Sequence, residues 1–130
     1  GRTPNDRYIM RLSETYLLRA EAYFHKGDLA NAANDINVVR GRAQAKPVQP
    51  GQISLDYILD ERMRELVVEE PRRKTLVRLN KLYERTMKYN FRVKDNMEPY
   101  HELWPIPQTA IDANTGAKLL QNPGYPGAAE

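Results

Sequence analysis

The chain has 130 residues, a hydrophobic content of 41% and a formal net charge of +3. This length suits one domain with a modest core, and the small, mixed charge does not indicate a nucleic-acid binder. Because cysteine is absent, disulfides, thiolate catalysis and cysteine-ligated metals are excluded from this chain.

The first residues, GRTPNDRY, contain no initiator methionine and do not resemble a signal peptide. No run approaches the ~20 consecutive apolar residues of a membrane-spanning helix. We therefore expect that an N-terminal part of the protein is missing from this chain.

Residues 13–44 predict two helices joined by a tight turn. Ser13 is the expected N-cap of the first helix, which runs to about residue 26. Gly27 suits the left-handed end of that helix, and Asp28 suits the N-cap of the next. The apolar stripes at helical spacing are Tyr16, Leu17, Ala20, Tyr23 and Phe24 on the first helix, and Leu29, Ala32, Ala33, Ile36 and Val39 on the second.

The order of large and small residues in this pair is typical of a tetratricopeptide repeat. Ala20 and Ala32 would let the two backbones approach closely, although Arg19 stands where such repeats usually have leucine. One copy is visible, whereas stacked repeats generally need three or more to bury their faces. The apolar flanks of residues 13–42 are thus expected to exceed what this chain can cover.

A second helix pair is predicted over residues 54–88, after a loop at residues 45–53. Ser54 would cap a helix spanning Leu55 to Glu70, and Pro71 would open one continuous fourth helix ending near Lys88. The third helix's inward stripe is expected to be Ile58, Leu59, Arg62, Leu66 and Val67, with Arg62 snorkelling to solvent. The fourth helix's apolar side is expected to be Leu76, Leu79, Leu82 and Tyr83.

From residue 90 to residue 130 the regular pattern fails, because prolines interrupt it. They stand at Pro99, Pro105, Pro107, Pro123 and Pro126. We expect an ordered, irregular strap over the helices, with one short helical turn at residues 108–114 and with Trp104, Ile106 and Ile111 buried. The predicted fold class is therefore all-α: tetratricopeptide-like helix pairs in a superhelix, followed by a proline-rich strap.

The predicted fourth helix carries a basic stripe, formed by Lys74, Arg78, Lys81, Arg85 and Lys88. One interpretation is a surface for phosphates or another anionic partner, which would bind nucleic acid with strong salt dependence. The favoured interpretation is a solvated face that pairs with acidic residues of the preceding helix. Those acidic residues are Asp60, Glu61, Glu65 and Glu69.

The sequence offers no catalytic or metal-binding constellation. His25 and His101 are far apart and have no carboxylate at metal-ligand spacing. Asp60–Glu61, Glu65 and Glu69–Glu70 could nominally supply the carboxylate pair of a glycosidase, but surface ion pairs with arginine are favoured. No glycine-rich phosphate loop or nucleophile elbow is present. We expect no enzyme activity, no cofactor and no metal.

Three aromatic residues are candidates for a ligand-stacking platform, because tyrosine and tryptophan stack on planar or apolar ligand faces. They are Tyr100, Trp104 and Tyr125. Since Trp104 lies among Leu103, Pro105 and Ile106, burial in the core is the favoured alternative for it.

Four stretches, taken in order, resemble the C-terminal part of the SusD/RagB family. They are "YLLRAEAYFHKGDLANAANDINVVRGRA", "ILDERMRELVVEE", "LWPIPQTAID" and "LLQNPGY". The likeness spans about residues 8–125, and the last stretch is typical of the end of such proteins. One departure is that the family usually continues from the second stretch with a Gly-His-Arg-Trp-Phe-like run, where this chain has Glu70-Pro71-Arg72-Arg73-Lys74-Thr75.

This resemblance implies a lipoprotein on the extracellular face of a Bacteroidetes-type outer membrane. Such proteins bind oligosaccharides, or peptides in some branches, and deliver them to a SusC-like TonB-dependent transporter. Membrane contact would be made only through a lipid anchor in the missing N-terminal part. The resemblance carries no ligand-binding residue onto this sequence. The alternative is a cytosolic tetratricopeptide-type scaffold that binds other proteins.

Overall fold

The computed structural model describes residues 9–128, and over this range it contains six α-helices and no named strand. The all-α fold class predicted from the sequence is confirmed. The chain divides into two compact units, Gly1–Pro71 and Arg72–Glu130. The division of the sequence into segments 13–44, 54–88 and 90–130 stays a prediction.

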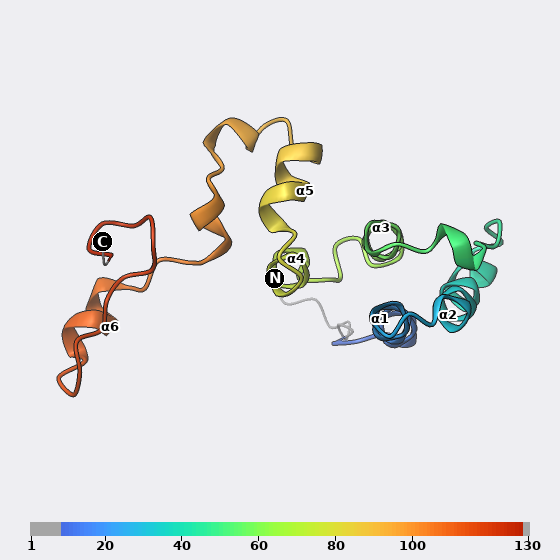
Figure 1. The fold of residues 1–130 in the computed structure, drawn as a ribbon, viewed down its shortest axis with the longest axis horizontal. Helices are drawn as coiled ribbons and strands as arrows, with labels where there is room; N and C mark the ends of the chain where they lie inside the picture. The colour runs from blue at the N-terminus through green and yellow to red at the C-terminus, as the bar shows by residue number, and fades with distance from the viewer. Residues whose placement is uncertain (1–8, 129–130) are drawn as a thin grey trace, which may run out of the picture. The chain divides into compact units, whose positions relative to one another are not determined.

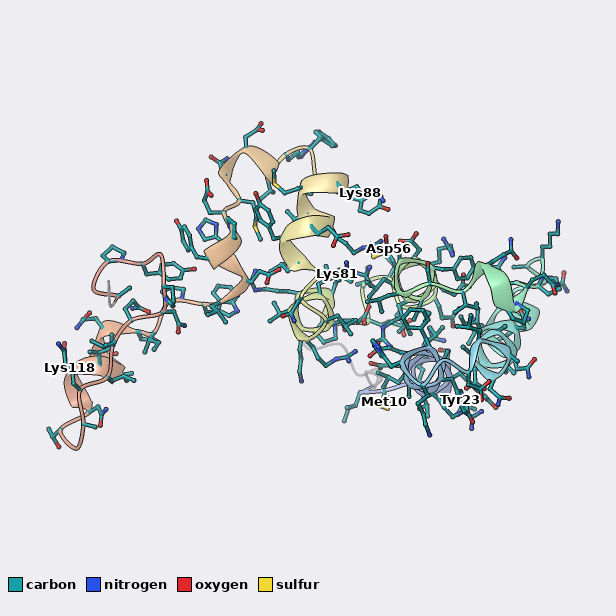
Figure 2. All side chains as sticks on the ribbon, in the orientation of Figure 1. Met10, Tyr23, Asp56, Lys81, Lys88 and Lys118 are labelled. Carbon is teal, nitrogen blue, oxygen red and sulfur yellow. The ribbon has the colours of Figure 1, made fainter. Side chains whose placement is uncertain are left out.

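The first unit contains three α-helices: α1 (Leu12–His25), α2 (Leu29–Arg42) and α3 (Leu55–Glu65), with a short 3₁₀ turn η1 (Pro50–Gln52) between α2 and α3. α1 and α2 form a hairpin, and α3 packs against both (Figure 1). Side chains fill the space among the three helices (Figure 2). The core consists of Leu17, Ala20, Ala32, Ala33, Ile36, Val39, Val48, Ile53, Ile58 and Leu66.

The α1–α2 turn forms as its local sequence predicts. Gly27 has φ +78°, and the N–H groups of Gly27 and Asp28 donate to the carbonyls of Phe24 and Tyr23, which is the hydrogen-bond pattern of a Schellman helix end. The Asp28 carboxylate accepts from the Asn31 N–H at 3.1 Å and so caps α2. The pKa of Asp28 is lowered, chiefly by the hydrogen bond from the Asn31 side chain.

The predicted cap of α1 is wrong, whereas that of α3 is confirmed. The N-cap of α1 is Arg11, and Ser13 lies inside the helix. Arg11 takes this place because its carbonyl accepts from the N–H of Glu14 at 2.9 Å and its guanidinium reaches across to Glu65. The Ser54 hydroxyl accepts from the Tyr57 N–H at 3.1 Å.

The third helix ends at Glu65 and not at Glu70. The chain turns at Val68, which has a left-handed φ of +69° and is 99% exposed. A β-branched residue in that region is strained. The turn nevertheless buries Leu66 and directs Glu70 back toward α3, whereas Val67, expected in the core, is 54% exposed.

The second unit contains α4 (Arg72–Arg78), α5 (Leu82–Tyr89), the 3₁₀ turns η2 (Lys94–Asn96) and η3 (Pro99–Glu102), and α6 (Gln108–Ala113). The continuous fourth helix of the prediction is therefore two helices. Asn80, with φ +52°, ends α4, and the Lys81 N–H donates to the Leu76 carbonyl at 2.8 Å in a second Schellman end. Asparagine is the residue after glycine that best tolerates this conformation.

The break at Asn80 also overturns the predicted basic stripe. Lys74 and Arg78 lie on α4, whereas Arg85 and Lys88 lie on α5, so helical spacing no longer aligns them on one face. Arg85 is buried, and Lys81 pairs with Glu84 of α5. Leu76 and Leu82 are buried as expected.

Residues 90–128 are irregular, as the prolines predict, and α6 occupies the expected short turn. Hydrogen bonds between distant residues join this segment to the helices of the second unit. Glu102 accepts from the Tyr83 N–H at 3.0 Å, near the start of α5, and the His101 carbonyl accepts from Arg73 of α4 at 2.7 Å. Glu102 thus serves as a cap of α5 from a distant part of the sequence.

Candidate functional site

Trp104 is 70% exposed, which makes the expectation of its burial wrong. The guanidinium carbon of Arg73 lies 4.4 Å from the centroid of its ring, within cation–π range. Arg73 is itself fixed, because it donates to the His101 carbonyl. The apolar neighbours of Trp104 in the sequence predicted that its ring packs in the core. The ring instead contacts the Arg73 guanidinium and lies at the surface.

Tyr100 and Tyr125 meet at the surface of the same unit. Their ring centroids are 5.0 Å apart in an edge-to-face arrangement, and the His101 ring lies 4.2 Å from Tyr100. The Tyr125 hydroxyl donates to the Leu103 carbonyl at 2.9 Å. Both tyrosines are half-buried, so each presents part of its ring to solvent.

A glycine makes this aromatic contact possible. Gly124 has φ +85°, and a Cβ built on it would lie 2.3 Å from Cγ of Tyr100. Because no side chain fits there, the backbone of residue 124 packs directly on the Tyr100 ring. The glycine in the motif LLQNPGY is thus required by both its conformation and its contact.

The motif LLQNPGY fixes the segment that carries Trp104. The Gln121 side-chain amide donates to the Ile106 carbonyl at 2.8 Å, and its oxygen accepts from the Ile106 N–H at 2.7 Å. The Asn122 amide donates to the Trp104 carbonyl at 2.7 Å. These bonds supply partners to a backbone that prolines keep out of regular structure, so two stretches distant in sequence hold one another in place.

Of the three candidates, Tyr100 and Tyr125 are in direct ring contact. Trp104 is connected to them indirectly. Tyr125 and Asn122 donate hydrogen bonds to the carbonyls of Leu103 and Trp104. Arg73 contacts the Trp104 ring and also donates to the carbonyl of His101, the neighbour of Tyr100. Their role as a ligand-stacking platform stays a prediction. Sequence reasoning missed Arg73. The signal for it was an arginine at a place where the family that the chain resembles has an aromatic residue.

The first unit contains a buried ionic network that the sequence did not reveal. Arg62 is 1% exposed, so the expectation that it snorkels is wrong. Its Nε donates to Glu70 at 2.7 Å, and its Nη2 lies 3.4 Å from Glu14 of α1. The turn after α3 brings Glu70 back to Arg62, which removes the need for either group to reach water.

Two acidic side chains of α3 are also shielded from solvent, contrary to the expectation of surface pairs: that of Glu61 is 6% exposed and that of Glu65 is 8% exposed. Glu61 binds Arg40 at 2.8 Å and Arg64 at 2.7 Å. Glu65 binds Arg42 at 2.8 Å and Arg11 at 3.0 Å. Burial by itself would raise the pKa of Glu65, but the hydrogen bonds from the arginines outweigh it, and the pKa lies below its ordinary value.

The departure at Arg19 from the tetratricopeptide pattern has a local explanation. Arg19 of α1 makes two hydrogen bonds to the buried Asp35 of α2, at 2.7 and 2.6 Å. The pKa of Arg19 is raised, chiefly by this pairing. A bidentate ion pair thus joins the two helices where leucine would otherwise pack.

Within residues 9–128, no group of three or more histidine, cysteine, aspartate or glutamate side chains is arranged to hold a metal ion. Over the same range, no helix combines the length and apolar character needed to cross a membrane.

The family model described as the SusD family matches residues 1–125, and the chain therefore belongs to that family. It is 36% identical over 124 residues to the starch-binding protein SusD of Bacteroides thetaiotaomicron. The aligned region covers 90% of this chain and 21% of that protein. It is 34% identical over 119 residues to the SusD-like protein P25 of Formosa agariphila, covering 85% of this chain and 23% of that protein. The chain thus spans about a fifth of the length of these curated relatives. No solved structure matches the chain.

Proposed function

We propose that this chain is the C-terminal part of a surface lipoprotein that binds glycans and passes them to a TonB-dependent outer-membrane transporter. The observation that carries the proposal is the family match over residues 1–125, together with the similarity to a starch-binding protein across 90% of the chain. Family membership does not favour the alternative of a cytosolic scaffold.

The proposed mechanism is capture without turnover. Aromatic rings would stack on the apolar faces of sugar rings, and polar groups would bind the hydroxyls. Within this chain we assign the stacking role to Trp104, whose ring Arg73 fixes in place, with Tyr100 and Tyr125 beside it. Peptides are the second ligand class that the proposal admits. The protein would be attached to the extracellular face of the outer membrane by a lipid anchor outside these residues.

Calorimetry of the complete protein against a panel of oligosaccharides and peptides tests the proposal. We expect binding to at least one glycan, with no new reducing ends or cleaved peptides after prolonged incubation. Replacement of the exposed ring in Trp104→Ala should weaken binding about tenfold, the value of one good aromatic contact. Phe91→Ala is the matched control, because Phe91 is 75% exposed in the same unit but outside the platform.

A panel that stays silent throughout would contradict the proposed ligand class. Equal affinities for Trp104→Ala and Phe91→Ala would leave glycan binding in place but remove Trp104 from it. Location and partner are tested separately. Proteinase K added to intact cells should degrade the protein, and a TonB-dependent transporter should copurify with it. Resistance to the protease on intact cells would place the protein elsewhere.

A further inference from the structure

Positive charge is concentrated in the first part of the second unit. Between residues 72 and 92 the sequence has eight lysine or arginine residues and one acidic residue, Glu84. This stretch contains α4 and α5, where Lys81 and Lys88 can be followed in Figure 2. Its formal charge exceeds the +3 of the whole chain, so the remainder of the chain is net acidic. Such an excess of positive charge attracts anionic ligands through its long-range field.

Arg73 carries its charge without a counter-ion in the part of the chain that the structure describes. It is half-buried, its Nη2 donates to the neutral carbonyl of His101, and its guanidinium carbon lies over the Trp104 ring. Its Nε is shielded from solvent and has no hydrogen-bond partner among the described residues. Glu102 follows His101 but is engaged elsewhere, since it accepts from the Tyr83 N–H. An anion brought by a ligand would stabilise a partly buried cation of this kind.

Arg73 also connects the two parts of the aromatic platform. It contacts the Trp104 ring and donates to residue 101, whose ring lies 4.2 Å from that of Tyr100. Trp104 stays 70% exposed although the guanidinium covers one face of its ring, so the other face is open to a sugar. An oligosaccharide that stacks on both Trp104 and the tyrosines therefore passes the guanidinium. A charged substituent at the edge of one of its sugars would meet the N–H donors there.

We propose that Arg73 makes the platform selective for acidic glycans, which carry carboxylate or sulfate groups. Both groups present anionic oxygens, to which a guanidinium donates short, charge-assisted hydrogen bonds. Neutral sugars would stack on the same rings but would leave the charge of Arg73 without a partner. The inference rests on the proposed function, because it requires glycan capture at Trp104, and it adds the charge of the ligand.

Calorimetry of the complete protein with matched pairs of ligands tests the charge of the ligand. One pair is an oligogalacturonate and its methyl ester, and the other is a sulfated galactan oligosaccharide and its desulfated form. Starch oligosaccharides supply a further neutral ligand. We expect the acidic member of at least one pair to bind about tenfold more tightly, as one charge-assisted hydrogen bond predicts. The pair with the larger ratio distinguishes carboxylate from sulfate, and added salt should reduce the ratio.

Substitution of Arg73 assigns the preference to a residue. Arg73→Gln should lower the ratio of acidic to neutral affinity to about one, whereas a residue that only positions Trp104 would weaken both ligands equally and leave the ratio unchanged. Arg73→Lys keeps the charge and should retain most of the ratio. Arg92→Gln is the matched control, because Arg92 is an exposed arginine of the same unit that lies 5.8 Å from the Phe91 ring centroid, outside the platform. It should leave the ratio unchanged.

Equal affinities within both pairs for the unsubstituted protein would overturn the inference while leaving glycan capture in place, and this comparison needs no variant that might fail to fold. Binding to starch oligosaccharides alone would have the same meaning. A ratio that Arg73→Gln and Arg92→Gln lower equally would also overturn it, since the preference would then come from the overall charge of residues 72–92. Silence toward every glycan would instead contradict the proposed function, and the inference with it.

Discussion

The buried pair between Arg62 and Glu70 offers the sharpest test of how the first unit is held together. Glu70→Gln keeps the volume of the side chain but removes the charge that faces a guanidinium exposed by only 1%. Removing one partner of a buried pair costs about 3–5 kcal/mol, because the remaining charge is left without compensation. Glu14 lies 3.4 Å from Arg62 and retains part of the attraction, so we expect the lower end, about 3 kcal/mol.

Thermal and urea denaturation followed by circular dichroism measure this loss. The first unit comprises Gly1–Pro71, and for a domain of that size each 1 kcal/mol lowers the melting temperature by about 4–8 °C. The expected shift is therefore at least about 12 °C. Glu69→Gln is the control, because Glu69 has a 44% exposed side chain paired with Arg11 and should cost less than about 1 kcal/mol.

The double variant Arg62→Met with Glu70→Leu separates charge from packing. Apolar side chains of similar volume often replace a buried ion pair without loss, so the double variant should be at least as stable as Glu70→Gln. If Glu70→Gln and Glu69→Gln destabilised the protein equally, the reasoning would fail, since burial of Arg62 would then have no energetic consequence.

Three further outcomes follow from local geometry. Gly27→Ala should lower the unfolding free energy by about 1 kcal/mol, because residue 27 has φ +78°. Gly41→Ala inside α2 should raise it by about 0.5–1 kcal/mol, since an added Cβ meets no other atom there. Melting curves of the two variants should therefore shift in opposite directions. Gly124→Ala should displace Tyr100 and change the near-ultraviolet circular dichroism, and an unchanged spectrum would contradict the close contact. The pKa of Glu65 is lowered in the folded state, so its contribution to stability is complete above its ordinary value of 4.5 and is lost as the pH falls through the lower, folded-state value. The acid limb of the stability curve should accordingly be shallower in Glu65→Gln, and identical limbs would refute this assignment.

The sequence by itself determined the features that depend on a few neighbouring residues. Gly27 and Asp28 specify the end of α1 and the start of α2, because a left-handed glycine and an N-cap carboxylate act within one turn. Ser54 specifies the start of α3 for the same reason. The hairpin core also follows from the sequence, since helical spacing alone places Leu17 and Ile36 on inward faces.

Only the tertiary structure decided which charges are buried and which aromatic residue is exposed. Arg62 is buried because Glu14, 48 residues away, and Glu70 both reach it, and no local pattern encodes that convergence. Trp104 is exposed because Arg73 binds its ring and Asn122, 18 residues away, holds its backbone. The break at Asn80 lies between these cases. Asparagine often ends a helix in the left-handed conformation, but the apolar residues on both sides of Asn80 keep helical spacing and so predicted one continuous helix. In the structure Asn80 adopts φ +52°, and the helix ends there.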